Sequence, residues 1–120
     1  MNFDIKKEEL KPIYDNRKSF YKKAYIEYHT EWNELHSRIK KIKLYSYNTI
    51  ICTIEYIDSE NRFYHIHNDN LISQTTLRHL KEFLLQLFYC KEKTLTKKEI
   101  LKNRTAKYNV VQDVFLDLPY

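Results

Sequence analysis

Three side chains near the middle of the chain have the chemistry of metal ligands. A β-hairpin built from residues 44–57 and 62–67 would place Cys52 opposite His67 and put His65 on the same face of the sheet. Thiolate sulfur and imidazole nitrogen are ligands that zinc prefers in proteins. His29 or His36 could complete the set only if the first strand lies alongside. Because there is no clear fourth ligand and no CxxC pair, we interpret the three residues as partly buried side chains. We therefore expect no metal and no other cofactor.

His79 is a second candidate for chemistry, as a general base. It lies on the polar side of a helix expected over residues 73–90, together with Arg78, Glu82 and Gln86. A general base must reach the group that it deprotonates, and the sequence pairs His79 with no nucleophile. The chain contains no glycine, hence no phosphate-binding glycine loop or GxSxG motif, and it has no HExxH motif. We therefore do not expect an enzyme.

The composition is that of a folded single domain covering residues 1–120. Of these residues, 42% are hydrophobic and 15% are aromatic, which is too rich for a disordered chain. No apolar run approaches the roughly 20 residues that span a bilayer, and no signal peptide is recognisable. The two cysteines, Cys52 and Cys90, do not form a CxxC motif, and the sequence leaves open whether they pair in a disulfide. We expect a cytoplasmic protein without membrane contact.

The net charge of +5 admits nucleic acid as a partner. Lysine and arginine can neutralise phosphates, and the 11 tyrosines could stack on bases. However, the 21 positive residues are spread along the chain among 16 acidic ones. Such mixing is typical of a solvated surface, so the charge favours nucleic acid only as a second choice.

The clearest local signal is a helix over residues 73–90. Ser73 can cap its first turn. Its apolar residues recur at steps of three and four: Leu77, Leu80, Phe83, Leu84, Leu87 and Phe88. Residues 44–57 are rich in Tyr, Ile and Thr and predict a strand, which a turn over 58–61 joins to a strand over 62–67. Together they predict an α+β fold, a small antiparallel sheet packed on one face by the helix, with short peripheral helices.

Residues before this hairpin give conflicting signals. Apolar residues step by three and four from Tyr21 to Ile42, which by periodicity alone predicts a helix from about Ser19 to Lys40. The β-branched and aromatic residues favour instead a strand over residues 21–28, followed by a shorter helix.

The two ends of the chain carry weaker patterns. Residues 1–18 are charged and interrupted by Pro12, which predicts a short helical turn or a mobile arm. Thr96 and Glu99 have the spacing of a capping box at the start of a short helix. We expect residues 91–120 to form a peripheral extension whose tail is an edge strand or a docked segment.

Two parts of the chain carry motifs: KAYI (23–26) with LYSYNTIICTI (44–54), and SQTTLRHLKEFLLQ (73–86). They resemble the KAxV, LxSYxTxVAxI and SxTTxxHxxEFLxQ motifs of a family of small proteins of phages and mobile elements in Gram-positive bacteria. The motif positions are Ser46, Tyr47, Thr49, Ser73, Thr75, Thr76, His79, Phe83, Leu84 and Gln86. The resemblance implies a strand over 21–28, with a helix only from about Thr30 to Lys40.

The resemblance also implies a context, an accessory protein made inside a bacterium by an invading element. We therefore expect a non-catalytic binding protein, most concretely an anti-CRISPR-like inhibitor that blocks a Cas effector through protein or guide-RNA contacts rather than by mimicking DNA. The alternative is a nucleic-acid-binding accessory factor of phage replication or transcription, and a metal-dependent enzyme is the third hypothesis. The candidate partner-binding residues are Arg78, His79, Glu82, Gln86, Tyr45 and Tyr47.

Overall fold

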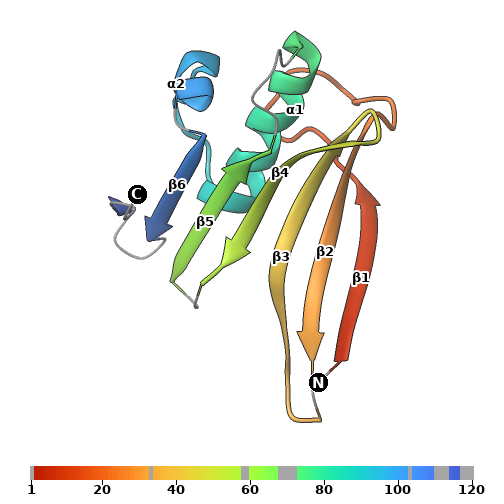
Figure 1. The fold of residues 1–120 in the computed structure, drawn as a ribbon. Coiled ribbons are helices and arrows are strands. Elements are labelled where there is room, and N and C mark those ends of the chain that lie inside the picture. Colours follow the sequence, from red (N-terminus) through yellow and green to blue (C-terminus); the bar gives the residue numbers. More distant parts are fainter. Residues whose placement is uncertain are drawn as a thin grey trace.

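The computed structural model describes residues 2–32, 34–57, 60–67, 73–102, 104–109 and 114–116. In these ranges, seven strands form one antiparallel sheet in which their spatial order equals their order in the sequence (Figure 1). The strands are β1 (Asn2–Glu9), β2 (Ala24–Trp32), β3 (Ser37–Ser46), β4 (Thr49–Tyr56), β5 (Asn61–Ile66), β6 (Thr105–Asn109) and β7 (Val114–Leu116). The helices are α1 (Gln74–Leu84), its π-helical continuation η1 (Leu85–Tyr89) and α2 (Lys97–Lys102). The predicted α+β class with an antiparallel sheet is confirmed.

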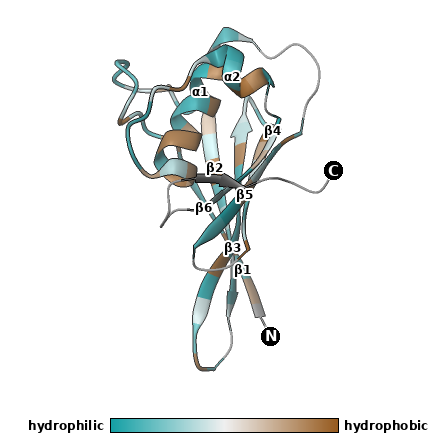
Figure 2. Cartoon of the chain, turned by 90° about the vertical axis from the view of Figure 1, so that its left-hand side faces the viewer, coloured by the Kyte–Doolittle hydropathy of each residue, from teal (hydrophilic) through white to brown (hydrophobic). Residues whose placement is uncertain are grey.

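Strands β1–β3 extend beyond the rest of the sheet. β4 pairs only with residues 41–46 of β3 in the described register, so the sheet narrows to three strands beyond Lys41. These strand ends project away from α1 and α2 (Figures 1 and 2). We call residues 2–5, 29–32 and 34–40 the β-arm.

The helix predicted within residues 19–40 is wrong, both as one long helix and as a shorter one from about Thr30 to Lys40. Residues of β2 and β3 occupy this region. Burial there has the period of a strand, because Ala24 and Ile26 are buried, whereas Leu35 of the expected helical stripe is 90% exposed. Pairing of β2 with strands on both sides decides the structure, and local periodicity does not detect such pairing.

The strand predicted over residues 21–28 exists but is shifted along the chain. β2 begins at Ala24 and continues to Trp32. Tyr21 and Lys22 form a turn with φ of 54° and 59°, in the left-handed region.

The segment predicted as one strand over residues 44–57 is two strands. Tyr47 and Asn48 form a two-residue turn between β3 and β4, with φ of 51° and 67°. Positive φ at both positions is the geometry of a tight hairpin turn, which usually contains glycine. Asn48 tolerates this conformation, but the Tyr-Asn pair lacks the glycine that would have marked the turn.

The register between β4 and β5 differs by one residue from the prediction. Cys52 lies opposite Ile66 rather than His67. Because side chains alternate between faces, this shift turns Tyr64 and Ile66 toward the core and moves His65 to the other face. Burial of a tyrosine and an isoleucine outweighs burial of histidines. Positions 58 and 59 of the expected turn lie outside the described residues.

The N-terminal segment forms a strand, not the helical turn or arm expected over residues 1–18. β1 pairs with β2 along its whole length. Its backbone groups are therefore satisfied on one side by the sheet, although its side chains are mostly exposed.

The segment after Cys90 contributes to the core and is not only peripheral, contrary to expectation. The predicted capping box is confirmed, since Thr96 Oγ1 accepts the Glu99 N–H at 3.1 Å. Ile100 of α2 and Tyr108 of β6 are almost fully buried. β7 pairs with β6 at the end of the strand order and is thus an edge strand, one of the two alternatives expected for the tail.

The predicted helix over residues 73–90 is confirmed. Ser73 Oγ accepts the Thr76 N–H at 3.1 Å, and Cys90 ends η1 with φ of 57°. Buried side chains of α1 and η1 belong to the same hydrophobic cluster as those of β2–β6, and the Tyr64 and Phe88 rings meet edge to face at 4.9 Å. Within the described ranges, neither α1 nor α2 has the length and apolar character needed to cross a membrane.

Candidate functional site

A pocket of about 320 Å³ opens beside the first turns of α1. Its walls come from residues 17–23, from Tyr47 in the turn between β3 and β4, and from residues 74–79. The volume lies at the lower end of the range of small-molecule sites. Segments that are far apart in the sequence therefore build one concave surface.

The pocket is positively charged. Arg17, Lys23 and Arg78 line it, and its lining contains no carboxylate. Arg78 Nη1 lies 3.3 Å from Asp15 Oδ1, just outside the lining. Lys23 Nζ lies 5.5 Å from the centre of the Tyr47 ring, a cation–π distance. In the described part of the chain, the side chains of Arg17 and Lys23 pair with no carboxylate.

His79 lines the pocket and belongs to a buried polar network that joins α1 to the end of β3. Its Nδ1 lies 2.9 Å from Ser46 Oγ, which lies 3.1 Å from Thr76 Oγ1. Ser73 Oγ donates to Thr76 Oγ1 at 3.1 Å. The two segments that carry the sequence motifs meet in this network, which satisfies the polar groups of three buried side chains.

The sequence analysis found no hydroxyl group beside His79, whereas the structure places Ser46 there. Burial lowers the pKa of His79 to about 4; nearby Asp15 opposes this shift, and the Arg78 charge adds to it. His79 is therefore neutral near pH 7 and a weak base. Ser46 Oγ is shared with Thr76 and is almost fully buried. These properties fit a structural network better than a nucleophilic pair.

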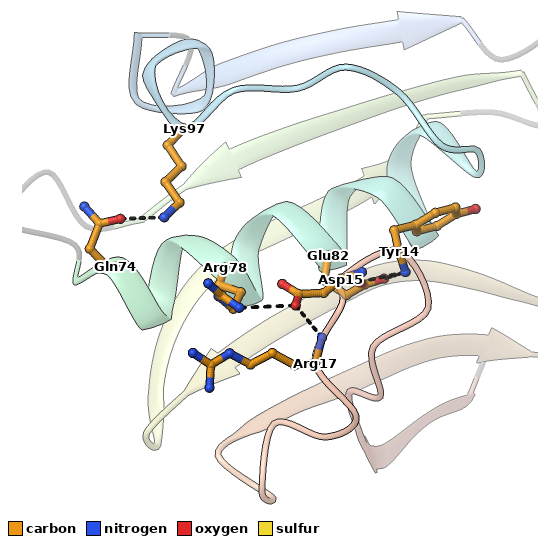
Figure 3. Close-up of polar contacts among 7 residues, drawn as sticks. All are labelled: Tyr14, Asp15, Arg17, Gln74, Arg78, Glu82 and Lys97. Atoms are coloured by element: carbon orange, nitrogen blue, oxygen red, sulfur yellow. Dashed lines mark hydrogen bonds and ion pairs between the residues drawn. The ribbon is translucent and has the colours of Figure 1, made fainter.

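Glu82 and Gln86, two of the candidate partner-binding residues, contact the chain's own N-terminal segment. The buried Glu82 carboxylate accepts the N–H of Tyr14 at 3.0 Å and that of Asp15 at 2.7 Å (Figure 3). Gln86 Nε2 donates to the Lys11 carbonyl at 2.7 Å and to Glu82 at 2.6 Å. Glu82 of α1 and Gln86 of η1 thus fix the loop between β1 and β2 and so position one wall of the pocket.

The two candidate tyrosines lie in different places. Tyr47 is about half exposed, at 49%, and lines the pocket. Tyr45 lies on the sheet face opposite to the buried Leu44 and Ser46, where its hydroxyl donates to Glu27 Oε1 at 3.3 Å. The structure thus brings together Arg78, His79 and Tyr47 and leaves the other three candidates outside the pocket.

Comparison with known proteins gives a family. The model of a family of unknown function, DUF8033, matches residues 8–103, which include every residue that lines the pocket. The chain belongs to DUF8033. No curated protein and no solved structure shows significant similarity to it.

The metal-ligand candidates are not brought together in this DUF8033 chain. Cys52 is fully buried, and burial raises the pKa of its thiol. His65 lies opposite Thr53 on the other face, with its ring 5.0 Å from that of His67, which hydrogen-bonds to Thr53. No cluster of three His, Cys, Asp or Glu side chains suited to a metal occurs among the described residues, and Cys52 and Cys90 are free thiols.

Sequence analysis missed the charged and aromatic residues of one wall of the pocket. These are Arg17, Phe20, Tyr21 and Lys23. The signal was present as the basic and aromatic run RKSFYKK over residues 17–23, which we divided between a charged arm and the start of a strand. Placing the run beside α1 requires the contacts of Glu82, which no local pattern contains.

The buried His79 of this DUF8033 protein predicts a pH-dependent stability. Its pKa is about 4 in the folded protein against 6.5 in the unfolded chain, so between these values the unfolded chain binds more protons. The free energy of unfolding should therefore fall as the pH drops through this window, with a slope approaching about 1.4 kcal/mol per pH unit from this residue. Urea unfolding of the wild type and of His79→Gln across the window measures it. Parallel pH profiles for the two proteins would show that His79 is not the cause.

Proposed function

We propose that this DUF8033 protein is a non-catalytic binding protein that acts by contact with a protein or ribonucleoprotein of a bacterial host cell. The observation that carries the proposal is the β-arm. Five large apolar side chains are exposed there: Phe3 at 70%, Ile5 at 63%, Trp32 at 37%, Leu35 at 90% and Ile39 at 38%. Concentrations of exposed apolar surface on soluble proteins mark interaction sites.

The shape of the β-arm supports an interaction role. It leaves the region of the helices as a three-stranded projection (Figures 1 and 2), and exposed apolar side chains lie on both of its faces. Phe3 and Ile5 lie opposite Glu31 and His29 on one face. Trp32 belongs to the alternate set of β2 positions and lies on the other face. A partner with a groove could contact both faces at once.

The charges of the β-arm favour a protein partner over nucleic acid. Asp4 and Glu31 stand among basic residues, and Lys40 Nζ forms an ion pair with Glu31 Oε2 at 3.5 Å. A surface that reads phosphates would be more uniformly basic. Mixed charge around an apolar centre is the usual composition of a protein interface.

The concrete form of the proposal is an anti-CRISPR-like inhibitor of a host defence complex. Its support is the resemblance to phage and mobile-element proteins in the motifs around Ser46 and His79. A basic chain is a poor mimic of DNA, so such an inhibitor would occupy a protein or guide-RNA surface of a Cas effector and block target entry or a domain motion.

The proposal also takes α1 and η1 as the cover of one sheet face, which leaves the β-arm as the uncovered part. This is supported by the Ser46–His79 hydrogen bond and by the contact of the Tyr64 and Phe88 rings. The helix and the sheet face that it covers would then form a rigid base from which the β-arm projects.

A second function, a nucleic-acid-binding accessory factor, is favoured by one observation. The pocket beside α1 gathers Arg17, Lys23 and Arg78 without a carboxylate in its lining. Phosphate-driven binding would show a steep salt dependence, with log K falling by about 0.7 to 0.9 per neutralised phosphate against log salt.

Capture of partners from host lysate tests the β-arm. The tagged protein should retain a host protein at physiological salt, and the double variant Phe3→Ser/Leu35→Ser should weaken this binding by at least about tenfold, as expected for interface anchors. Ile13→Ser is the matched control, because Ile13 is 70% exposed but lies outside the β-arm. Equal capture by all three proteins would contradict the role of the arm. Tight, steeply salt-dependent binding to random DNA or RNA, with no protein captured, would favour the second function.

A further inference from the structure

We propose that the pocket beside α1 binds a nucleoside monophosphate group, either as a free nucleotide or at the end of a strand, with its cations on the phosphate and its tyrosines against the base. This inference goes beyond the proposed function and does not depend on it, because the pocket and the β-arm involve different residues. It rests on the charge, the preorganisation and the aromatic walls of the pocket.

The positive charge of the pocket favours binding of an anion. Two guanidinium groups and one ammonium group line a volume of about 320 Å³. Like charges in so small a space repel one another, and a bound anion relieves this repulsion. Arginine donates paired hydrogen bonds that match the geometry of phosphate oxygens, and lysine adds a point charge.

Asp15 links the Arg17 backbone to the Arg78 side chain. Its Oδ1 accepts the backbone N–H of Arg17 at 2.9 Å and lies 3.3 Å from Arg78 Nη1 (Figure 3). Asp15 is itself fixed by Glu82, which accepts its N–H. Asp15 therefore positions the backbone that carries Arg17 and one guanidinium nitrogen of Arg78, and it leaves the Arg17 guanidinium and most Arg78 donors for a ligand.

The two turns that form the walls are tied to each other. The Tyr47 N–H donates to the Lys23 carbonyl at 2.9 Å, and the Lys23 N–H donates to the Phe20 carbonyl at 3.0 Å. Ser19 Oγ accepts the Tyr21 N–H at 2.9 Å. The walls are therefore positioned before any ligand arrives, which reduces the entropy cost of binding.

The aromatic walls suit a nucleobase. Tyr21 is 72% exposed and Tyr47 is 49% exposed, although both line the pocket. Both have φ near 50°, at 54° and 51°, which is unfavourable for a bulky side chain and recurs at ligand sites. The buried rings of Phe20 and His79, whose centres are 4.7 Å apart, add an aromatic surface below them. Exposed tyrosines beside cations are the combination that stacks bases while phosphates are neutralised.

Calorimetric titration of the full chain with adenosine monophosphate tests the site. We expect saturable binding, and a loss of affinity of at least about tenfold in Arg17→Ala, because a charge-assisted hydrogen bond is removed. Tyr47→Ala should lower the affinity by about fivefold or more, as expected for a lost stacking contact. Arg38→Ala is the matched control, since this arginine lies on the β-arm, and its affinity should equal that of the wild type.

Three further probes define the ligand. Adenosine without phosphate should bind at least about tenfold more weakly than the nucleotide. Inorganic phosphate should also bind more weakly, because it lacks the base. A tetranucleotide with a 5′-phosphate that binds more tightly than adenosine monophosphate identifies a strand end as the source, and the reverse order identifies a free nucleotide.

Three results would contradict the proposal or part of it. Absence of binding at millimolar nucleotide overturns the proposal, as does binding that Arg17→Ala and Tyr47→Ala both leave unchanged. Equal affinity for phosphate and nucleotide overturns the base-binding role. Arg17 and Tyr47 are exposed, so circular dichroism is expected to show that both variants remain folded.

Discussion

Phe83→Asp should unfold most of the protein. Phe83 has no exposed surface and belongs to the hydrophobic cluster shared by α1 and the sheet. The variant loses the burial of a large ring and places a carboxylate inside this hydrophobic cluster, which should cost at least about 4 kcal/mol of a total stability of about 5 to 15 kcal/mol. Leu80→Asp should behave in the same way, because Leu80 is equally buried. Urea unfolding followed by circular dichroism measures both.

Thr75→Asp is the matched control for this effect. It introduces the same charge into the same helix, but Thr75 is exposed and lies in the first turn, where a negative charge is favourable. Its free energy of unfolding should stay within about 0.5 kcal/mol of the wild type. If Phe83→Asp and Thr75→Asp had the same free energy of unfolding, the assignment of which face of α1 is buried would be incorrect.

Glu82→Ala should release the loop between β1 and β2. The variant leaves the N–H groups of Tyr14 and Asp15 without their acceptor, and Gln86 loses one of its two contacts. Loss of a buried charged acceptor costs about 2 to 4 kcal/mol. Hydrogen exchange should show faster exchange at the amides of residues 14 and 15, beyond the change elsewhere.

Two variants sharpen this experiment. Glu82→Gln keeps one carbonyl acceptor, so its loss of stability should be smaller than that of Glu82→Ala. Glu92→Ala removes an exposed carboxylate and should leave the stability and the two amides unchanged. Unchanged protection at residues 14 and 15 in Glu82→Ala would contradict the anchoring role.

Elements specified by local chemistry were predicted correctly. The helix over residues 73–90 depends on the cap at Ser73 and on a stripe of six apolar residues, and both act within a few residues of the chain. The capping box of Thr96 and Glu99 is equally local. These patterns can be recognised in the sequence because they depend only on neighbouring residues and not on the rest of the fold.

The sheet was predicted less well because its details depend on long-range pairing. Residues 61–67 alternate between two sets, one with Tyr64 and Ile66 and one with His65 and His67, and the sequence alone did not show which set is buried. A difference of one residue in register reversed the faces and separated Cys52 from both histidines. The helical periodicity of residues 21–42 was likewise accidental, since β2 is held by neighbours on both sides.

For the same reason, the sequence indicated only some of the residues that line the pocket. Tyr47, Arg78 and His79 were singled out because they lie in motifs or on the polar face of a predicted helix. Arg17 and Lys23 were not, because their place depends on contacts between residues more than 60 positions apart, such as the hydrogen bond from Asp15 to Glu82.

The strand order of the sheet has a consequence for the rate of folding. From β1 to β5, each strand pairs with its neighbour in the sequence, so pairing can proceed by short loop closures, each with a small entropy cost. The pairing of β5 with β6 is different, since His65 must meet Thr105 across α1, η1 and α2. This closure should be the slowest step of sheet formation, and until it occurs the buried Tyr108 remains outside the core. A nascent chain would therefore pair β1–β5 first and bury Tyr108 last.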